Sequence, residues 1–104
     1  MNPNPKPTRW ISKKYESWVR SLCCVNCETA HVEVHHAKGI GHLSGVGSKA
    51  GSQYSMPLCY HCHGIVHGKL GTPEQHKMFI ERQWEWIAKT LGMAIEEGVL
   101  KSNS

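Results

Sequence analysis

The sequence lacks a long apolar segment. It contains no run of roughly 18 apolar residues, which is the length that a transmembrane helix needs. Residues 1–9 are rich in Asn and Pro and have no apolar stretch, so they do not resemble a secretory signal. We therefore expect a cytoplasmic protein that has no membrane partner.

Hydrophobic residues are also scarce, at 39% of 104 residues. A chain of this size has room for one domain with a modest core, and such domains often need a disulfide or a metal for stability. The five cysteines are an odd number, which fits a disulfide framework poorly, and disulfides are rare in the cytoplasm. Together with eight histidines, they favour metal binding.

Net charge is absent from most of the chain. Residues 23–104 hold seven basic and seven acidic side chains, whereas residues 1–22 hold five basic side chains against Glu16 alone. The whole charge of +4 therefore lies in the N-terminal segment, which includes Lys13 and Lys14. A basic segment of this kind suits DNA, and the alternative is a solvated helix face beside a mobile arm.

Apolar periodicity predicts the first elements. Residues 1–10 are expected to form a flexible arm, and helical spacing of apolar residues predicts a helix over residues 12–22 with Ser12 as its N-cap. Alternation predicts one strand over residues 29–36 and a second over residues 54–58. The glycine-rich stretch between the strands is expected to be a flexible loop.

Two helices are predicted after the second strand. Residues 59–67 should form a short helix that ends at Gly68, and a capping box that begins at Thr72 starts a longer one. Gly92 should weaken this long helix, and Gly98 should end it. Its apolar stripe is expected to comprise Ile80, Trp84, Ile87, Leu91 and Ile95. These elements predict a single α+β domain over residues 11–100.

Two C-x2-C knuckles predict a structural zinc site. Cys24 and Cys27 form one knuckle, Cys59 and Cys62 form the other, and 31 residues separate them. Each two-residue gap lets both sulfurs face one ion, and four thiolates fill a tetrahedral zinc site completely. Cys23 is an alternative first ligand, with a three-residue gap in place of two.

Histidines cluster beside both knuckles. His63 and His67 have the i, i+4 spacing that puts two imidazoles on one helix face, and His35 adds a third neutral ligand from the strand. Three ligands leave coordination positions open for water and a phosphate oxygen. The adjacent His36 should point to the other side of the strand or bend away at its end, so it need not be a ligand and can remove a proton from water.

The run from Cys24 to His67 resembles the HNH nuclease motif. The matching residues are Cys24-x2-Cys27, Glu33-Val34-His35-His36, and Pro57-Leu58-Cys59-x2-Cys62-His63-x3-His67. Within that superfamily the run is most similar to phage Ref-type recombination-enhancement nucleases and short prophage nucleases, with residues 22–68 as the motif core. The resemblance implies a small ββα-metal (His-Me finger) core, flanked here by an N-terminal helix and a long C-terminal helix.

The resemblance also implies an activity and its residues. His35, His63 and His67 are expected to hold one catalytic divalent cation (Mg²⁺, Mn²⁺, Ni²⁺ or Zn²⁺), and His36 is expected to be the general base for hydrolysis of DNA phosphodiester bonds. The usual Asn of the motif is absent, because the matching stretch contains Gln53 and no Asn. Gln53 or a backbone contact is expected to hold the loop in its place.

Lysines and tryptophans complete the expectations. Lys38, Lys49 and the basic N-terminal segment should contact backbone phosphates. Trp84 and Trp86 on the last helix suit a homodimer contact, and host recombination proteins are the partners that the resemblance implies. Two alternatives to a recombination nuclease are a zinc-stabilised DNA-binding module without catalysis and a toxin or restriction-like nuclease with the same chemistry.

Overall fold

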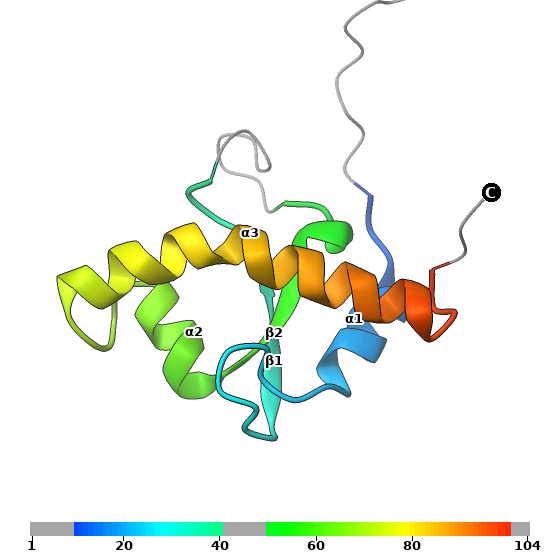
Figure 1. Cartoon of the computed structure of the whole chain (residues 1–104), viewed down its shortest axis with the longest axis horizontal. Helices are drawn as coiled ribbons and strands as arrows, with labels where there is room; N and C mark the ends of the chain where they lie inside the picture. Colours follow the sequence, from blue (N-terminus) through cyan, green and yellow to red (C-terminus); the bar gives the residue numbers. More distant parts are fainter. Residues whose placement is uncertain (1–9, 41–49, 101–104) are drawn as a thin grey trace, which may run out of the picture.

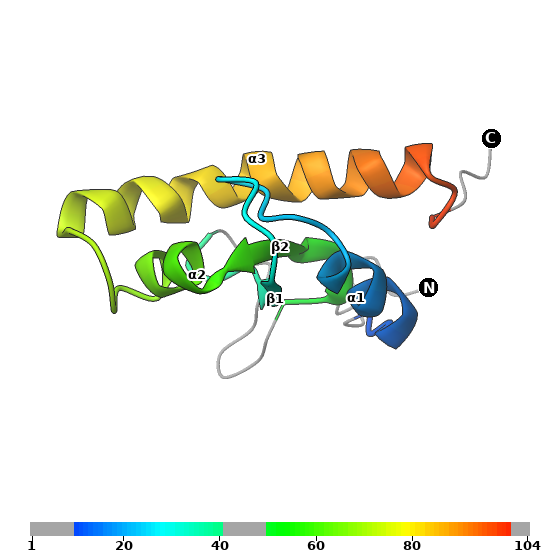
Figure 2. The same ribbon diagram turned by 90° about the horizontal axis from the view of Figure 1, so that it is seen from below.

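A computed structural model describes residues 10–40 and 50–100 of the chain. Its elements, in order, are α1 (Lys13–Arg20), β1 (Val32–His36), the short 3-10 helix η1 (Ser52–Tyr54), β2 (Ser55–Cys59), α2 (Tyr60–Val66) and α3 (Pro73–Glu96). Figures 1 and 2 show α3 running along one side of the molecule, over α2, the strands and α1. The α+β class predicted from the sequence is therefore confirmed.

The two strands form an antiparallel pair that places alternate β1 residues on opposite faces. His35 pairs with Met56, and His36 pairs with Ser55. His35 lies toward α2, whereas Val34 packs against the cluster around α1. The strand starts at Val32 and not at residue 29, because Glu28 and His31 have positive φ values of 65° and 63°, which belong to a turn.

Both predicted helix caps are present. Ser12 caps α1 by accepting a hydrogen bond from the Tyr15 amide at 3.0 Å. At the start of α3 the Gln75 amide donates to Thr72 Oγ1 at 3.1 Å, and the Thr72 amide donates to Gln75 Oε1 at 2.8 Å. The capping box read from the sequence is thus confirmed, although α1 ends at Arg20 and not at residue 22.

The buried face of α3 differs from the predicted stripe. Ile87 is buried as expected, but Trp84 and Ile95 are 51% and 54% exposed. Trp86 is only 2% exposed, so it packs inside the core and not in a surface contact between two chains. The buried positions of α3 are Phe79, Gln83, Trp86, Ile87, Thr90 and Ala94. Two polar residues, Gln83 and Thr90, therefore belong to the inner face of α3. A search for apolar residues at helical spacing does not find them.

The core has two parts that α3 joins. The larger part packs the strands and α2 against α3, with Met56, Leu58 and Val66 fully buried. The smaller part packs Tyr15 and Val19 of α1 against Ala94. No helix in the described ranges 10–40 and 50–100 is both long and apolar enough to cross a membrane.

Two glycines near the end of α3 should respond oppositely to alanine. A Cβ at Gly92, inside the helix, would meet no atom within 4 Å. Gly92→Ala should therefore raise the free energy of unfolding by about 0.5–1 kcal/mol through helix propensity. Gly98 has φ of +75°, so Gly98→Ala should lower it by about 1 kcal/mol. Urea unfolding of zinc-saturated protein measures both changes, and a destabilised Gly92→Ala variant would contradict this prediction.

Candidate metal centres

Four sulfurs from three segments of the chain meet at one point. Cys24 and Cys27 lie in the turn between α1 and β1, Cys59 ends β2, and Cys62 lies in the first turn of α2. Their sulfur atoms all lie within 4.8 Å of one another, with Cys27 Sγ 3.6 Å from Cys59 Sγ and 3.9 Å from Cys62 Sγ. Tetrahedral zinc with Zn–S bonds of about 2.3 Å places its sulfurs about 3.8 Å apart. This four-cysteine cluster therefore fits a structural zinc ion.

Backbone hydrogen bonds hold the first knuckle in place. The Cys24 amide donates to the Thr29 carbonyl at 2.8 Å, and the Glu28 amide donates to the Cys24 carbonyl at 2.8 Å. The Val25 amide donates to the Pro57 carbonyl at 2.9 Å, which ties the turn to β2. The turn is thus fixed to the strand that ends at the second knuckle.

The thiols of the four-cysteine cluster differ in acidity. The hydrogen bond from the Thr29 side chain lowers the pKa of Cys27 to about 6. Burial raises the pKa of Cys59 and that of Cys62. Four thiolates packed this closely repel one another, so a bound cation is what allows all of them to be deprotonated together.

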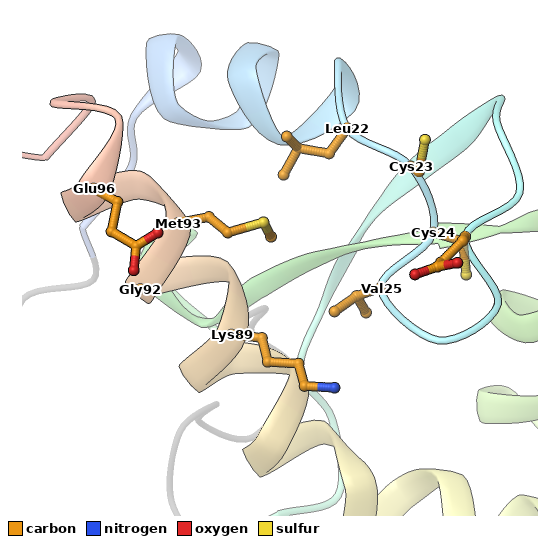
Figure 3. Close-up of a pocket in the computed structure, with 9 residues that line it drawn as sticks. Leu22, Cys23, Cys24, Val25, Lys89, Gly92, Met93 and Glu96 are labelled. Atoms are coloured by element: carbon orange, nitrogen blue, oxygen red, sulfur yellow. The ribbon is translucent and has the colours of Figure 1, made fainter.

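Cys24, and not Cys23, belongs to the four-cysteine cluster. Figure 3 shows the sulfurs of these neighbours pointing in opposite directions. Cys23 is exposed and lines a cavity of about 500 Å³ between the knuckle turn and the second half of α3. Of the two cysteines that the sequence left open as the first zinc ligand, it is Cys24 that lies close to the other three sulfurs.

Three histidines form a second group that could hold a metal ion. The ligand nitrogens of His35, His63 and His67 lie within 4.8 Å of one another, as the sequence predicted. The two Nε2 atoms of His63 and His67 are 3.0 Å apart. Two nitrogens that bind one ion at about 2.1 Å and at a right angle lie about 3.0 Å apart, so this separation is compatible with a shared ion.

Gln83 on α3 orients the first of these ligands. Its amide nitrogen donates to the carbonyls of Lys38 and Ile80, at 2.8 and 2.9 Å, so its Oε1 is an acceptor. His35 Nε2 therefore donates to Gln83 Oε1 at 2.8 Å, which leaves the lone pair on Nδ1. Burial lowers the pKa of His35 to about 3 and keeps the ring neutral, as a metal ligand must be.

The other two ligands also have polar partners. His63 Nδ1 donates to Glu33 Oε1 at 2.8 Å, which leaves the lone pair on its Nε2 atom. Lys38 Nζ lies 3.3 Å from His67 Nδ1, and burial together with this lysine lowers the pKa of His67. The Glu33 carboxylate is a partner of the kind that commonly orients a metal-binding imidazole and strengthens it as a ligand. The Lys38 ammonium can only donate, so it takes the lone pair of His67 Nδ1 and does not act in this way.

His36 occupies a separate environment on the other face of β1. Its Nδ1 donates to the Ala50 carbonyl at 3.0 Å, so the lone pair is on Nε2. That Nε2 atom is 3.8 Å from Glu16 Oε2, and Glu16 also accepts a hydrogen bond from Ser52 Oγ at 2.6 Å. A backbone contact thus holds His36, which is one of the two arrangements expected in place of the missing Asn.

Gln53 does not supply this support. Its Oε1 is buried and has no hydrogen-bond partner among the described residues. Three side chains beside the histidines were missed in the sequence, namely Gln83, Glu33 and Glu16. Glu33 shares the strand face of His35, so alternation could have identified it, and Gln83 stands out as a polar residue among buried α3 positions. Glu16 is 20 residues from His36, and no local pattern connects them.

The predicted DNA-binding lysines have different positions. Lys38 lies beside His67, whereas Lys13 and Lys14 are exposed on α1. Lys49 and residues 1–9 of the predicted arm lie outside the described residues. Trp10, the last residue of that arm, packs against Tyr15 with ring centroids 5.6 Å apart, and its carbonyl accepts from the Ser52 amide at 2.8 Å.

Residues 2–98 match a family model described as "Protein of unknown function (DUF968)". The chain belongs to this family. It is 36% identical over 63 residues to the "Uncharacterized protein YdfU" of Escherichia coli (strain K12). The match covers 61% of this DUF968 chain but only 18% of that relative. No solved structure matches the chain.

Adjacent cysteine variants should test the assignment of the four-cysteine cluster. Cys24→Ser removes a ligand, so the purified protein should lose its zinc, about one ion per chain, and should unfold or aggregate. Cys23→Ser should keep both the zinc and the fold, because that sulfur points away from the cluster. Metal analysis and circular dichroism measure the two outcomes. Zinc loss in Cys23→Ser but not in Cys24→Ser would reverse the assignment.

Proposed function

We propose that this DUF968 chain is a metal-dependent HNH-type endonuclease that hydrolyses DNA phosphodiester bonds. The observation that carries the proposal is that two adjacent histidines lie on opposite faces of β1. His35 joins the three-histidine group, whereas His36 lies on the other face with Nδ1 on the Ala50 carbonyl, which leaves Nε2 as the nitrogen that can act as a base. A general base at the residue that follows a metal ligand in the chain is what the resemblance to the HNH motif leads one to expect.

In this mechanism His36 accepts the proton of the attacking water at Nε2. The Ala50 carbonyl holds the ring in the required tautomer, and the Glu16 carboxylate, 3.8 Å away, stabilises the imidazolium that forms. A divalent ion on the three-histidine group would supply Lewis-acid stabilisation of charge on the phosphate and on the leaving oxygen. The ligand set leaves coordination positions open, unlike the closed four-cysteine cluster.

Basic side chains would bind the DNA backbone. The Lys38 ammonium lies beside His67 and is exposed, so it can contact a phosphate near the three-histidine group. Lys13 and Lys14 add positive charge on α1, within the N-terminal segment 1–22 that holds the net charge of the chain. A phage or prophage origin and a role in recombination rest on the resemblance alone.

Replacing Gln83 should weaken the catalytic site without breaking its ligand set. Gln83→Leu removes the acceptor for His35 Nε2, so Mn²⁺ or Ni²⁺ should bind roughly 10- to 100-fold more weakly by calorimetric titration. Thr90→Val is the matched control, because Thr90 is buried on the same face of α3 and, among the described residues, its side chain bonds only the Trp86 carbonyl. Equal metal affinity in wild type and Gln83→Leu would contradict this role for Gln83.

Variants of the two adjacent histidines should lose plasmid cleavage for different reasons. His35→Ala removes a ligand, so metal binding weakens, plasmid cleavage is lost, and excess metal restores part of it. His36→Ala removes the base, so metal binding survives while the cleavage rate falls by roughly 10²- to 10⁴-fold at every metal concentration. His61→Ala, at an exposed position of α2, is the control and should cut normally. DNA binding should persist in all three variants.

Two outcomes would contradict the proposed nuclease function. One is that both His35→Ala and His36→Ala cut plasmid DNA as well as wild type. The other is that wild type binds DNA but never cuts it with Mg²⁺, Mn²⁺, Ni²⁺ or Zn²⁺. The second result would favour the zinc-stabilised DNA-binding module, which needs only the closed four-cysteine cluster.

A further inference from the structure

A cavity of about 420 Å³ adjoins the three-histidine group. Its volume lies within the range of roughly 300–1,000 Å³ that is usual for small-ligand pockets. Its lining combines an aromatic ring, two metal-site imidazoles, a cation and an apolar wall. A carboxylate also belongs to the lining, whose residues are Glu33, Tyr60, His63, Gly64, His67, Lys69 and Leu70.

We propose that this cavity holds one unpaired nucleotide next to the scissile phosphate, with its base stacked on Tyr60 and its phosphate near Lys69. The proposal rests on the proposed nuclease function and adds a substrate class to it, namely DNA with an unpaired strand at the cleavage site. We call this cavity the Tyr60 pocket.

The position of Tyr60 favours stacking. The side chain is 76% exposed, which is unusual for an aromatic residue in a domain whose other aromatic side chains are mostly buried or half-buried. Its backbone is nevertheless held firmly, because Tyr60 lies between Cys59 and Cys62 of the four-cysteine cluster. An open ring on a fixed backbone loses little conformational entropy on binding, so it makes a ready platform for a base.

The helical spacing places this platform beside the chemistry. Tyr60, His63 and His67 stand at i, i+3 and i+7 of α2 and its C-cap, so they follow one helix face. Three residues correspond to about 4.5 Å along a helix axis. The backbone of Tyr60 is therefore less than one helical turn from that of His63, and both side chains line the same cavity.

The opposite wall of the Tyr60 pocket comes from the turn that follows α2. The amides of Lys69 and Leu70 both donate to the Gly64 carbonyl, at 2.8 and 3.2 Å, which fixes this turn against the helix. A Cβ at Gly64 would lie 2.5 Å from Leu70 Cδ1, so only glycine allows the leucine to close the wall. The Glu33 carboxylate also lines the pocket, but it is already bonded to His63 Nδ1.

This chemistry favours an unpaired base over a duplex. Neighbouring base pairs cover both faces of a base inside a duplex, so a tyrosine ring can stack only where a base is free. Base–aromatic stacking is tolerant of sequence, and a single lysine contacts phosphate without reading bases. The Tyr60 pocket should therefore select strand structure and not sequence.

Oligonucleotide binding to zinc-loaded protein without added catalytic metal tests the proposal. Fluorescence anisotropy would compare labelled single-stranded dT12 with a 12-base-pair duplex. Tyr60→Ala should weaken binding of dT12 by roughly 5- to 150-fold and binding of the duplex by less than twofold. Tyr60→Phe keeps the ring and should bind both probes as wild type does. Trp84→Ala, another exposed aromatic outside the pocket, is the control. A parallel titration with labelled rU12 shows whether the pocket prefers an unpaired base of RNA or one of DNA.

The possible results separate this proposal from the proposed function. If Tyr60→Ala weakens both probes equally, or neither probe, the Tyr60 pocket is not a nucleotide site, whatever the plasmid assay shows. If wild type never cuts plasmid but dT12 binding still depends on the Tyr60 ring, the proposed nucleotide site is retained and the proposed nuclease function is rejected. Preferential ring-dependent binding of rU12 would overturn the assignment to DNA.

Discussion

The meeting of four sulfurs is the constraint on which the other parts of the structure depend. The four-cysteine cluster joins the turn after α1, the end of β2 and the start of α2, and no loop residue separates β2 from α2. The hydrophobic core around α1 is small, because only Tyr15, Val19 and Ala94 are buried in the cluster that joins this helix to the end of α3. A zinc ion would fix the angle at which α2 leaves the sheet, and that angle brings His63 and His67 to His35.

The two candidate metal centres differ in openness, and their chemical roles would differ accordingly. Four thiolates complete the coordination of zinc, so nothing further can bind there. Three imidazoles leave positions open in the shell of a divalent ion, and two of them, His35 and His63, donate their other ring N–H to an oxygen acceptor. The first centre therefore suits structure, and the second suits binding of an exchangeable ligand.

Local patterns in the sequence predicted most elements, and they predicted which cysteines and which histidines lie close together. Knuckle spacing, the i, i+4 histidines and the capping box depend on residues close together in the chain, where geometry follows directly from spacing. The supports of the histidines were not predictable in this way. Gln83 is 48 residues from His35, and Glu16 is 20 residues from His36, so only the packed fold brings them together.

The errors have physical causes of the same kind. Both Trp84 and Trp86 are apolar and lie on one helix, and hydrophobicity alone does not decide which of them faces the sheet. The helix rotation that buries Trp86 also buries Gln83, whose amide is needed by His35 and by the backbone of Lys38. A polar anchor thus helps to set the inner face that an apolar stripe was expected to define.

The alternation of β1 has a consequence for how this sequence can vary. Side chains on a strand change faces at every residue, so a shift of one position would exchange the places of His35 and His36. The left-handed residues Glu28 and His31 set the phase in which the chain enters the strand. An insertion or deletion of a single residue within β1, between Val32 and His35, would therefore invert the assignment of the two imidazoles, even though every residue type was retained. We expect the length of this short segment to be invariant wherever both histidines are retained.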